Sequence, residues 1–196
     1  KQIVTWGSKP FKNTRNDVTY HHCPTEYELL TSFINYWMQD VPDVITGWNI
    51  QLFDIPYICK RLQRVLGEKL MKRFSPWGLV SEGEIHVMGR THIVFDVGGV
   101  TQLDYIDLYK KFTYKAQESY RLDYIAQVEL GQKKLDHSEF ETFKDFYTKG
   151  WQKFIEYNII DVELVDRLED KMKLIELCLT MAYDAKVNYN DVFYQV

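Results

Sequence analysis

Two segments in the first third of the chain have apolar residues at helical spacing. The first is expected to begin near Thr25, because Thr25 and Glu28 have the spacing of a capping box and apolar residues then recur every three or four positions up to Trp37. The second covers residues 53–66, where Pro56 is tolerated in the first turn since its missing N–H would have no partner there. The pattern predicts two helices in this part of the chain.

Helical spacing dominates the last third of the chain. From residue 139 to residue 181 the pattern is almost entirely helical, with a break near Gly150. A shorter helix that ends at Val128 should precede it, with Ser119 as its N-cap.

Between the predicted helices, short runs rich in β-branched and aromatic residues predict strands. These runs cover residues 3–6, 18–21, 44–46, 84–87, 91–97 and 100–105. The run 44–46 is typical of a buried strand, and 84–87 with 91–97 predicts a hairpin around Gly89. Strands interleaved with helices predict an α/β fold with a mixed sheet and flanking helices.

Composition narrows the class of protein. The chain has 196 residues, of which 45% are hydrophobic and 15% aromatic, so it can bury a core and is not a disordered chain. No apolar run approaches the roughly 20 residues of a membrane span, and we expect no membrane partner. Residues 1–6 do not form a signal peptide and the first residue is not Met, so we expect the sequence to start partway through a longer chain.

The net charge and the spacing of the Cys and His residues exclude further classes of protein. The net charge is −4, so any binding of phosphate groups must be local or assisted by metal ions. Three cysteines without C-x-x-C spacing fit a reducing compartment and are most simply small apolar fillers. The five histidines have no zinc spacing. His21 and His22 are expected at a solvated strand end, with metal binding as the less favoured alternative.

The segment from residue 45 to residue 57 is the first candidate site. A strand leads into a turn, and Asp54 then stands at the start of a helix, with Asn49 and Phe53 just before it. Active sites of α/β proteins collect at such strand ends. The alternative is that Asp54 only caps the helix, because helix N-termini favour negative charge.

The second candidate site lies in the long helical region. Tyr157 and Asp161 are four residues apart, which places a phenol and a carboxylate on one helix face. Such a pair suits a bound water molecule and a cation. By itself the spacing is also common by chance, and the alternative is a Tyr at the edge of the core beside a solvated Asp.

Together and in this order, the two segments resemble the second and third motifs of the 3′→5′ proofreading exonuclease in B-family DNA polymerases. Asn49–Asp54 is similar to the second motif, and Tyr157–Asp161 to the tyrosine-bearing form of the third. The resemblance extends to polymerases of T-even-type bacteriophages over most of the chain. It is carried by four blocks, Thr46–Tyr57, Leu103–Phe112, Ser119–Ile125 and Tyr157–Val162. A stand-alone repair exonuclease of the histidine subclass is disfavoured, since no His stands four or five residues before Asp161.

The family's first motif, D-x-E on a strand, has no counterpart. The D-x-E of this sequence is Asp161–Glu163, inside the third motif. The resemblance therefore implies that residues 1–196 are a partial exonuclease domain of a ribonuclease-H-like fold, without its D-x-E strand and without palm, fingers and thumb. A gap in the sheet would invite self-association, strand exchange or poor order of the first residues.

The resemblance also implies roles for individual residues. Asp54 and Asp161 would each hold one of two divalent ions, Mg²⁺ or Mn²⁺, and Tyr157 would orient the attacking water. Asn49 and Phe53 would contact the 3′-terminal nucleotides. The implied function is proofreading hydrolysis at the primer 3′ end of single-stranded or primer–template DNA, in the cytoplasm of an infected bacterium and alongside the remaining polymerase domains. The alternative is a catalytically silent fragment that binds single-stranded DNA weakly.

Other residues have competing interpretations. Asp107 is expected to cap the turn after its strand rather than bind metal, and Asp104 and Asp123 are expected to be structural. The hairpin around Gly89 and Arg90 resembles a family hairpin that separates primer from template, with ordinary sheet as the alternative. A basic stretch would be a solvated surface or a contact with DNA or another polymerase domain; it comprises Lys60, Arg61, Arg64, Lys69, Lys72 and Arg73.

Overall fold

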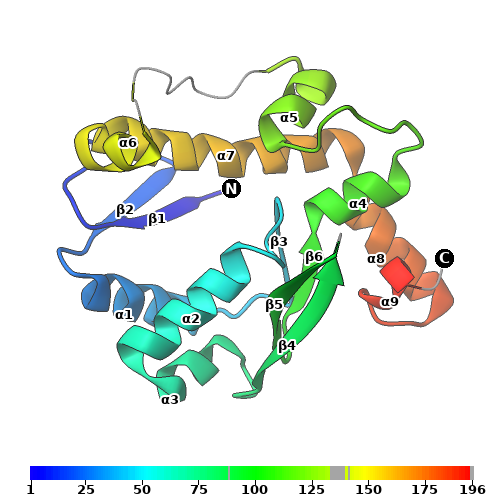
Figure 1. Ribbon diagram of the computed structural model, residues 1–196, viewed down its shortest axis with the longest axis horizontal. Coiled ribbons are helices and arrows are strands. Elements are labelled where there is room, and N and C mark those ends of the chain that lie inside the picture. Colours follow the sequence, from blue (N-terminus) through cyan, green and yellow to red (C-terminus); the bar gives the residue numbers. More distant parts are fainter. Residues whose placement is uncertain (88, 133–139, 141, 195–196) are drawn as a thin grey trace. The chain divides into compact units, whose positions relative to one another are not determined.

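The computed structural model describes residues 1–196 except 88, 133–139, 141 and 195–196. Helices and strands alternate in the first half, and helices follow in the second (Figure 1). In chain order the elements are β1 (Ile3–Gly7), β2 (Val18–His22), α1 (Glu26–Trp37), β3 (Val44–Gly47), α2 (Asp54–Leu66), α3 (Glu68–Met71), the 3₁₀ turn η1 (Lys72–Phe74), β4 (Val80–Val87), β5 (Arg90–Val97), β6 (Thr101–Asp104), α4 (Tyr105–Phe112), α5 (Leu122–Leu130), α6 (Phe143–Lys149), α7 (Trp151–Met172), α8 (Leu174–Ala185) and α9 (Asp191–Tyr194).

The chain divides into two compact units, and each is described by itself. The β1–β2 unit comprises residues 1–32 and 119–171, and the β3–β6 unit comprises residues 33–118 and 172–196. The expected α/β class is confirmed, and parallel and antiparallel pairing both occur. Among the described residues the strands form three two-stranded sheets, β1–β2, β3–β6 and β4–β5.

The β1–β2 unit packs a parallel strand pair against α7. The register runs from Ile3 opposite Val18 to Gly7 opposite His22. Val18 is buried with Ile155 and Ile159, which are four residues apart and hence on one face of α7. This contact is how the long amphipathic helix buries its apolar face.

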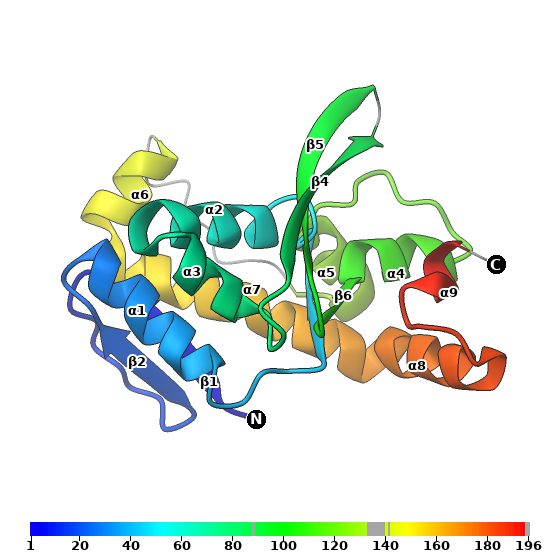
Figure 2. The same cartoon turned by 90° about the horizontal axis from the view of Figure 1, so that it is seen from below.

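The β3–β6 unit contains a second parallel pair and a long hairpin. The register from Val44 opposite Thr101 to Gly47 opposite Asp104 brings the carboxyl ends of β3 and β6 to the same edge. The hairpin β4–β5 is antiparallel, and Figure 2 shows its tip projecting from the rest of this unit. Fully buried side chains, including Leu62 of α2 and Leu103 of β6, form the core.

Most predicted elements are confirmed, including the break at Gly150 between α6 and α7. The helical region has a second break that the apolar pattern did not indicate. It lies at Lys173, whose φ of 57° is in the left-handed region and separates α7 from α8. The start of the predicted region, residue 139, lies outside the described residues.

Two further predictions were wrong in detail. Ser119 does not cap α5: the N-cap is Arg121, and the Ser119 hydroxyl accepts a hydrogen bond from the Arg121 amide before the helix begins. The strand 44–46 is not buried, because Val44 and Ile45 are half-buried and Thr46 is exposed. Its β-branched residues reflect pairing with β6 rather than coverage on both faces.

No helix within the described ranges combines the length and apolar character needed to cross a membrane.

The capping box at the start of α1 provides a test of the fold. The Glu28 amide donates to Thr25 Oγ1 at 3.2 Å, and the Thr25 amide donates to a carboxylate oxygen of Glu28 at 3.3 Å. Thr25→Ala is expected to lower the free energy of unfolding by about 1 kcal/mol, because an amide of the first turn loses its partner. Urea denaturation measures this change. Thr14→Ala, at an exposed position of the same unit, is the control; equal effects of the two variants would contradict the capping role.

Candidate active site

The turn between β3 and α2 presents three of the predicted site residues. Asn49 has a φ of 68°, Phe53 is the N-cap of α2, and Asp54 is its first helical residue. The turn leaves the carboxyl end of the parallel β3–β6 pair, which is where α/β proteins place their sites. Asn tolerates the left-handed region better than most residues, yet the conformation still has to be held by its surroundings.

A buried carboxylate holds this turn. Asp104 ends β6 and is only 4% exposed. One of its oxygens accepts a hydrogen bond from the Asn49 amide at 2.8 Å, and the other accepts from the Gln51 amide at 2.9 Å. Two oxygens of one side chain thereby fix two amides of the turn, which stabilises the left-handed residue between strand and helix.

The same carboxylate caps α4, since it also accepts from the Ile106 amide at 3.3 Å. The expectation that Asp107 is the cap was therefore wrong, whereas the structural role expected for Asp104 is confirmed.

Asp107 lies inside the first turn of α4 and, with Asp104, lines a cavity of about 450 Å³. Burial raises the pKa of Asp104 to about 6, and the amides that donate to it offset only part of this effect.

Apolar contacts hold the turn from its other side. Ile50 is buried at 7% exposure, and the Trp48 ring lies 6.3 Å from the Tyr105 ring and 6.1 Å from the Tyr109 ring. A Cβ on Gly47 would lie 2.5 Å from Cγ2 of Ile50, so any other residue here would force the buried Ile50 side chain to shift. The turn is thus fixed by hydrogen bonds and by packing.

Asp54 and Phe53 are held by this turn but remain exposed. Phe53 is 67% exposed, and Asp54 is also accessible to solvent. No side-chain hydrogen bond caps α2 and Asp54 is not its N-cap, but its carboxylate lies in the first turn, where a helix favours negative charge. Partial desolvation raises the pKa of the Asp54 carboxyl, while a backbone hydrogen bond lowers it. An accessible carboxylate can bind a cation, and an accessible aromatic ring beside it can stack on a nucleobase.

Tyr157 and Asp161 lie on α7, in the β1–β2 unit, and the predicted helix is confirmed. Their spacing places them on the same face of α7. The Tyr157 ring packs edge-on against buried Phe146, with centroids 5.6 Å apart. Asp161 is half-buried. Packing therefore fixes the direction of the phenol on the same helix face as the carboxylate.

Glu163, the second acidic residue of the D-x-E sequence, has a structural role. It pairs with Arg15 at 2.6 Å and with Arg167 at 3.8 Å. Residues two apart on a helix do not face each other, so Asp161 and Glu163 cannot converge on one ion. Where the chain is described, no cluster of three His, Cys, Asp or Glu side chains could hold a metal ion.

The structure thus groups the candidates by unit. Asn49, Phe53 and Asp54 come together at the β3–α2 turn, and Tyr157 and Asp161 come together on α7. Because each unit is described by itself, the convergence of the two groups stays a prediction.

The predicted hairpin is confirmed. Val87 pairs with Arg90 across the turn, and Gly89 has a φ of 75°, which favours glycine. Gly89 and Arg90 are both exposed near the tip. A contact of these two residues with DNA stays a prediction.

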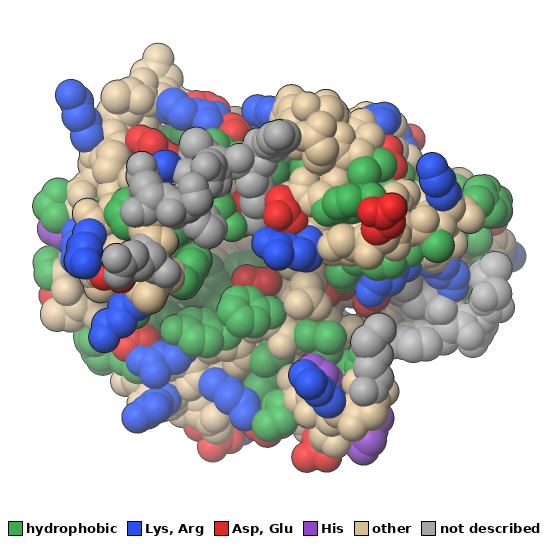
Figure 3. All heavy atoms as spheres, turned by 45° about the horizontal axis from the view of Figure 1, so that its top comes forward, with side chains coloured by type: hydrophobic (Ala, Val, Ile, Leu, Met, Phe, Trp, Pro, Cys, Tyr) green, Lys and Arg blue, Asp and Glu red, His purple; other side chains and the backbone are tan. Residues whose placement is uncertain are grey.

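The other candidates have structural explanations or remain open. His21 stacks on Trp6 with centroids 5.3 Å apart, and the three cysteines are buried, as expected for apolar fillers. In the basic stretch Lys60 and Lys72 pair with Glu82 and Glu68, so part of it is a solvated, ion-paired surface. Figure 3 shows basic and acidic side chains interspersed on one face of the molecule, in keeping with the net charge of −4.

Comparison with known protein families shows which family the chain belongs to. Residues 2–125 match the model of the family described as DNA polymerase family B, exonuclease domain. The chain belongs to this family. The family is ribonuclease-H-like and is generally dependent on divalent metal ions.

Relatives of this exonuclease domain include polymerases of two bacteriophages and of an invertebrate virus. The chain is 39% identical over 176 residues to the DNA-directed DNA polymerase of Escherichia phage RB69, covering 90% of this chain and 19% of the relative. It is 39% identical over 175 residues to that of Enterobacteria phage T4, covering 89% and 19%. DNA polymerase 037L of Invertebrate iridescent virus 6 is 33% identical over 176 residues, covering 82% and 14%. The chain spans about a fifth of the length of the two phage relatives.

The contribution of Asp104 can be tested by its pH dependence. The folded-state pKa of about 6 exceeds the ordinary value of 3.8, so the folded state binds this proton more tightly than the unfolded state. The stability from Asp104 is then present below about pH 4 and is lost as the pH rises through 6. The difference in unfolding free energy between the protein and Asp104→Asn should fall by about 3 kcal/mol over this range, at about 1.4 kcal/mol for each pKa unit. Urea denaturation at several pH values measures it, and a pH-independent difference would contradict the assignment.

Proposed function

We propose that this chain serves the 3′→5′ proofreading exonuclease of a replicative DNA polymerase, which removes nucleotides from the 3′ end of single-stranded or frayed primer–template DNA. The observation that carries the proposal is the β3–α2 turn, which presents exposed Asp54 and Phe53 at a strand end in a member of the family B exonuclease domain. The phage relatives support action in the cytoplasm of an infected bacterium, together with the other polymerase domains.

The donor chemistry of the chain fits a divalent ion. Asp54 and Asp161 supply carboxylate oxygens, which Mg²⁺ and Mn²⁺ prefer. When bound, a pair of such ions would supply an activated water and stabilise the charge that develops on the phosphate. Two carboxylates are fewer than two ions require, and Glu163 is engaged by Arg15 and Arg167. The proposal therefore needs further carboxylates besides Asp54 and Asp161, such as those of the family's D-x-E motif.

The other proposed site residues position the attacking water and the DNA. In the proposed site, Tyr157 orients the attacking water through a hydrogen bond of its hydroxyl. Phe53 packs against a terminal base, and Asn49 contacts the same nucleotides. Gly89 and Arg90 at the hairpin tip contact DNA where the primer leaves the template. The held geometry of the β3–α2 turn supports this division of roles, since a fixed turn aims the ring and the carboxylate together.

The second candidate is a catalytically silent fragment with weak binding of single-stranded DNA. It is favoured for these residues alone by the sequence, whose D-x-E is Asp161–Glu163 on α7 and not on a strand.

Activity of the chain by itself separates the two candidates. The 196-residue chain alone is expected to release few or no mononucleotides from 3′-labelled single-stranded DNA, because two carboxylates cannot hold two ions. A longer polypeptide that supplies a strand with D-x-E should be active with Mg²⁺ or Mn²⁺. Rapid, metal-dependent release by the 196 residues alone would exclude the silent-fragment candidate and the need for further carboxylates.

Substitutions in the whole polymerase test the individual roles. Asp54→Ala or Asp161→Ala should lower hydrolysis at least about a hundredfold, since each removes a ligand of ions worth several kcal/mol in the transition state. Tyr157→Phe should cost only about tenfold, the value of one hydrogen bond. Single-turnover release of the 3′ nucleotide measures these rates.

Asp166→Ala is the matched control for Asp161→Ala, because Asp166 is an exposed carboxylate on the same helix that pairs with Lys1. Near-normal hydrolysis by Asp161→Ala, or an equal loss in Asp166→Ala, would show that the metal assignment is wrong.

A further inference from the structure

One face of α2 carries a row of exposed aromatic and basic side chains that the proposed site does not use beyond its first member. The row, here named the α2 stripe, consists of Phe53, Tyr57, Lys60 and Arg64. These positions follow one another at intervals of four, three and four residues, so they lie within about 60° of the helix circumference. The opposite face is buried through Ile55, Pro56, Cys59 and Leu62.

The aromatic half of the stripe is open to solvent. Phe53 is 67% exposed and Tyr57 is 62% exposed, and they lie one helical turn apart, about 6 Å along the axis. Neither ring contacts another aromatic side chain in the part of the chain that the structure describes. Two large exposed rings side by side indicate a binding surface rather than a core.

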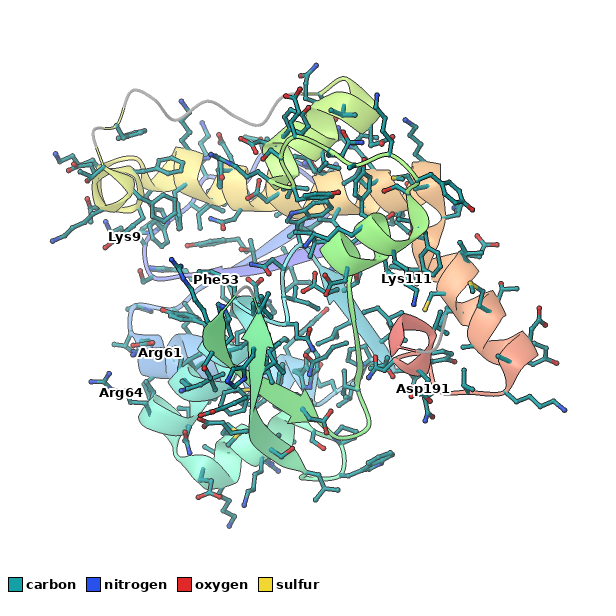
Figure 4. The ribbon with its side chains drawn as sticks, turned by 45° about the vertical axis from the view of Figure 1, so that its right-hand side comes forward. Lys9, Phe53, Arg61, Arg64, Lys111 and Asp191 are labelled. Atoms are coloured by element: carbon teal, nitrogen blue, oxygen red, sulfur yellow. The ribbon has the colours of Figure 1, made fainter. Side chains whose placement is uncertain are left out.

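The basic half of the stripe follows directly. Lys60 makes an exposed contact with Glu82 at 3.7 Å, which contributes little in water. Arg64 is exposed and forms no ion pair with any described residue. Figure 4 labels Phe53 near the start of α2 and Arg64 farther along it, with the Arg64 side chain projecting from the helix. The guanidinium is therefore available for an anionic partner.

We propose that the α2 stripe is a track for the single-stranded DNA that leads to Asp54. Bases stack on Phe53 and Tyr57, and the backbone phosphates pair with Lys60 and Arg64. The stripe begins at the N-cap next to Asp54 and runs from residue 53 to residue 64, about 16 Å along the helix axis, which is room for up to about five stacked nucleotides.

The charge of the α2 stripe and its continuity with Asp54 favour single-stranded DNA over a protein partner. Lysine is depleted at protein–protein interfaces, whereas the α2 stripe places Lys60 between the two rings and Arg64. Rings followed by cations match the bases and phosphates of a single strand. The inference rests on the proposed function for the direction of the strand, but binding along the stripe is measured without hydrolysis.

Fluorescence anisotropy with labelled oligo(dT) of four and twelve nucleotides, in EDTA, tests the track on the 196-residue chain. Tyr57→Ala should weaken binding of the twelve-nucleotide strand roughly fivefold or more, with an unchanged dependence on salt. Arg64→Ala should reduce the slope of log K against log salt by about 0.7, the value for one phosphate contact on a single strand. Tyr57→Phe should bind like the unmodified chain, because the ring is kept.

Two variants of the same unit serve as matched controls. Tyr114→Ala removes a fully exposed tyrosine outside the stripe, and Lys115→Ala removes an exposed cation that lies outside the basic stretch. Neither should change the binding of oligo(dT). All four positions are on the surface, so loss of folding does not confound the comparison.

Binding by Tyr57→Ala and Arg64→Ala equal to that of the controls would overturn the track. It would also be overturned if these variants kept DNA binding but lost association with another polymerase domain, since the stripe would then be a protein contact. If the stripe variants lose binding while the whole polymerase shows no 3′ hydrolysis, the proposed function fails and the track stands. If hydrolysis is present and the stripe variants bind normally, only the track fails.

Discussion

The candidate site depends on one buried carboxylate. Asp104 accepts from two amides of the β3–α2 turn and from one amide at the start of α4, so a single side chain connects a strand end, a turn and a helix. The interaction is strong because the group is almost fully shielded from water, where each hydrogen bond counts for more. Desolvation of the charge opposes it, and the raised pKa reports that cost. Without this anchor, the left-handed backbone at Asn49 would have no partner for its amide.

The helices were largely predictable because their signals are local. The capping box at Thr25 and the helix break at Gly150 each depend on residues within a few positions. The role of Asp104 toward the turn was not predictable in the same way, since Asn49 and Asp104 are 55 residues apart and meet only because β3 pairs with β6. The same limit explains the error at Asp107: the sequence contains two candidate caps in one block, and only the strand end decides between them.

Asp54, Tyr157 and Asp161 were predicted to be site residues from the order of two sequence motifs, because they are not close to one another along the chain. The structure gives each motif a local reason, because Asp54 follows a strand end and Tyr157 shares a helix face with Asp161. It also shows what the motifs leave out. The exposed face of α2 has no signature of its own: its spacing becomes informative only once burial shows that the other side of the helix is covered by protein.

The close approach at Gly47 has a genetic consequence. Its backbone lies so near the side chain of Ile50 that any added carbon must displace that buried side chain, which belongs to the turn that carries Phe53 and Asp54. If the proposed function holds, a change at Gly47 would reduce the removal of misincorporated nucleotides although the residue has no side chain to contact DNA or metal. Such an allele would appear as a mutator in replication fidelity, and inspection of catalytic residues alone would not identify its cause.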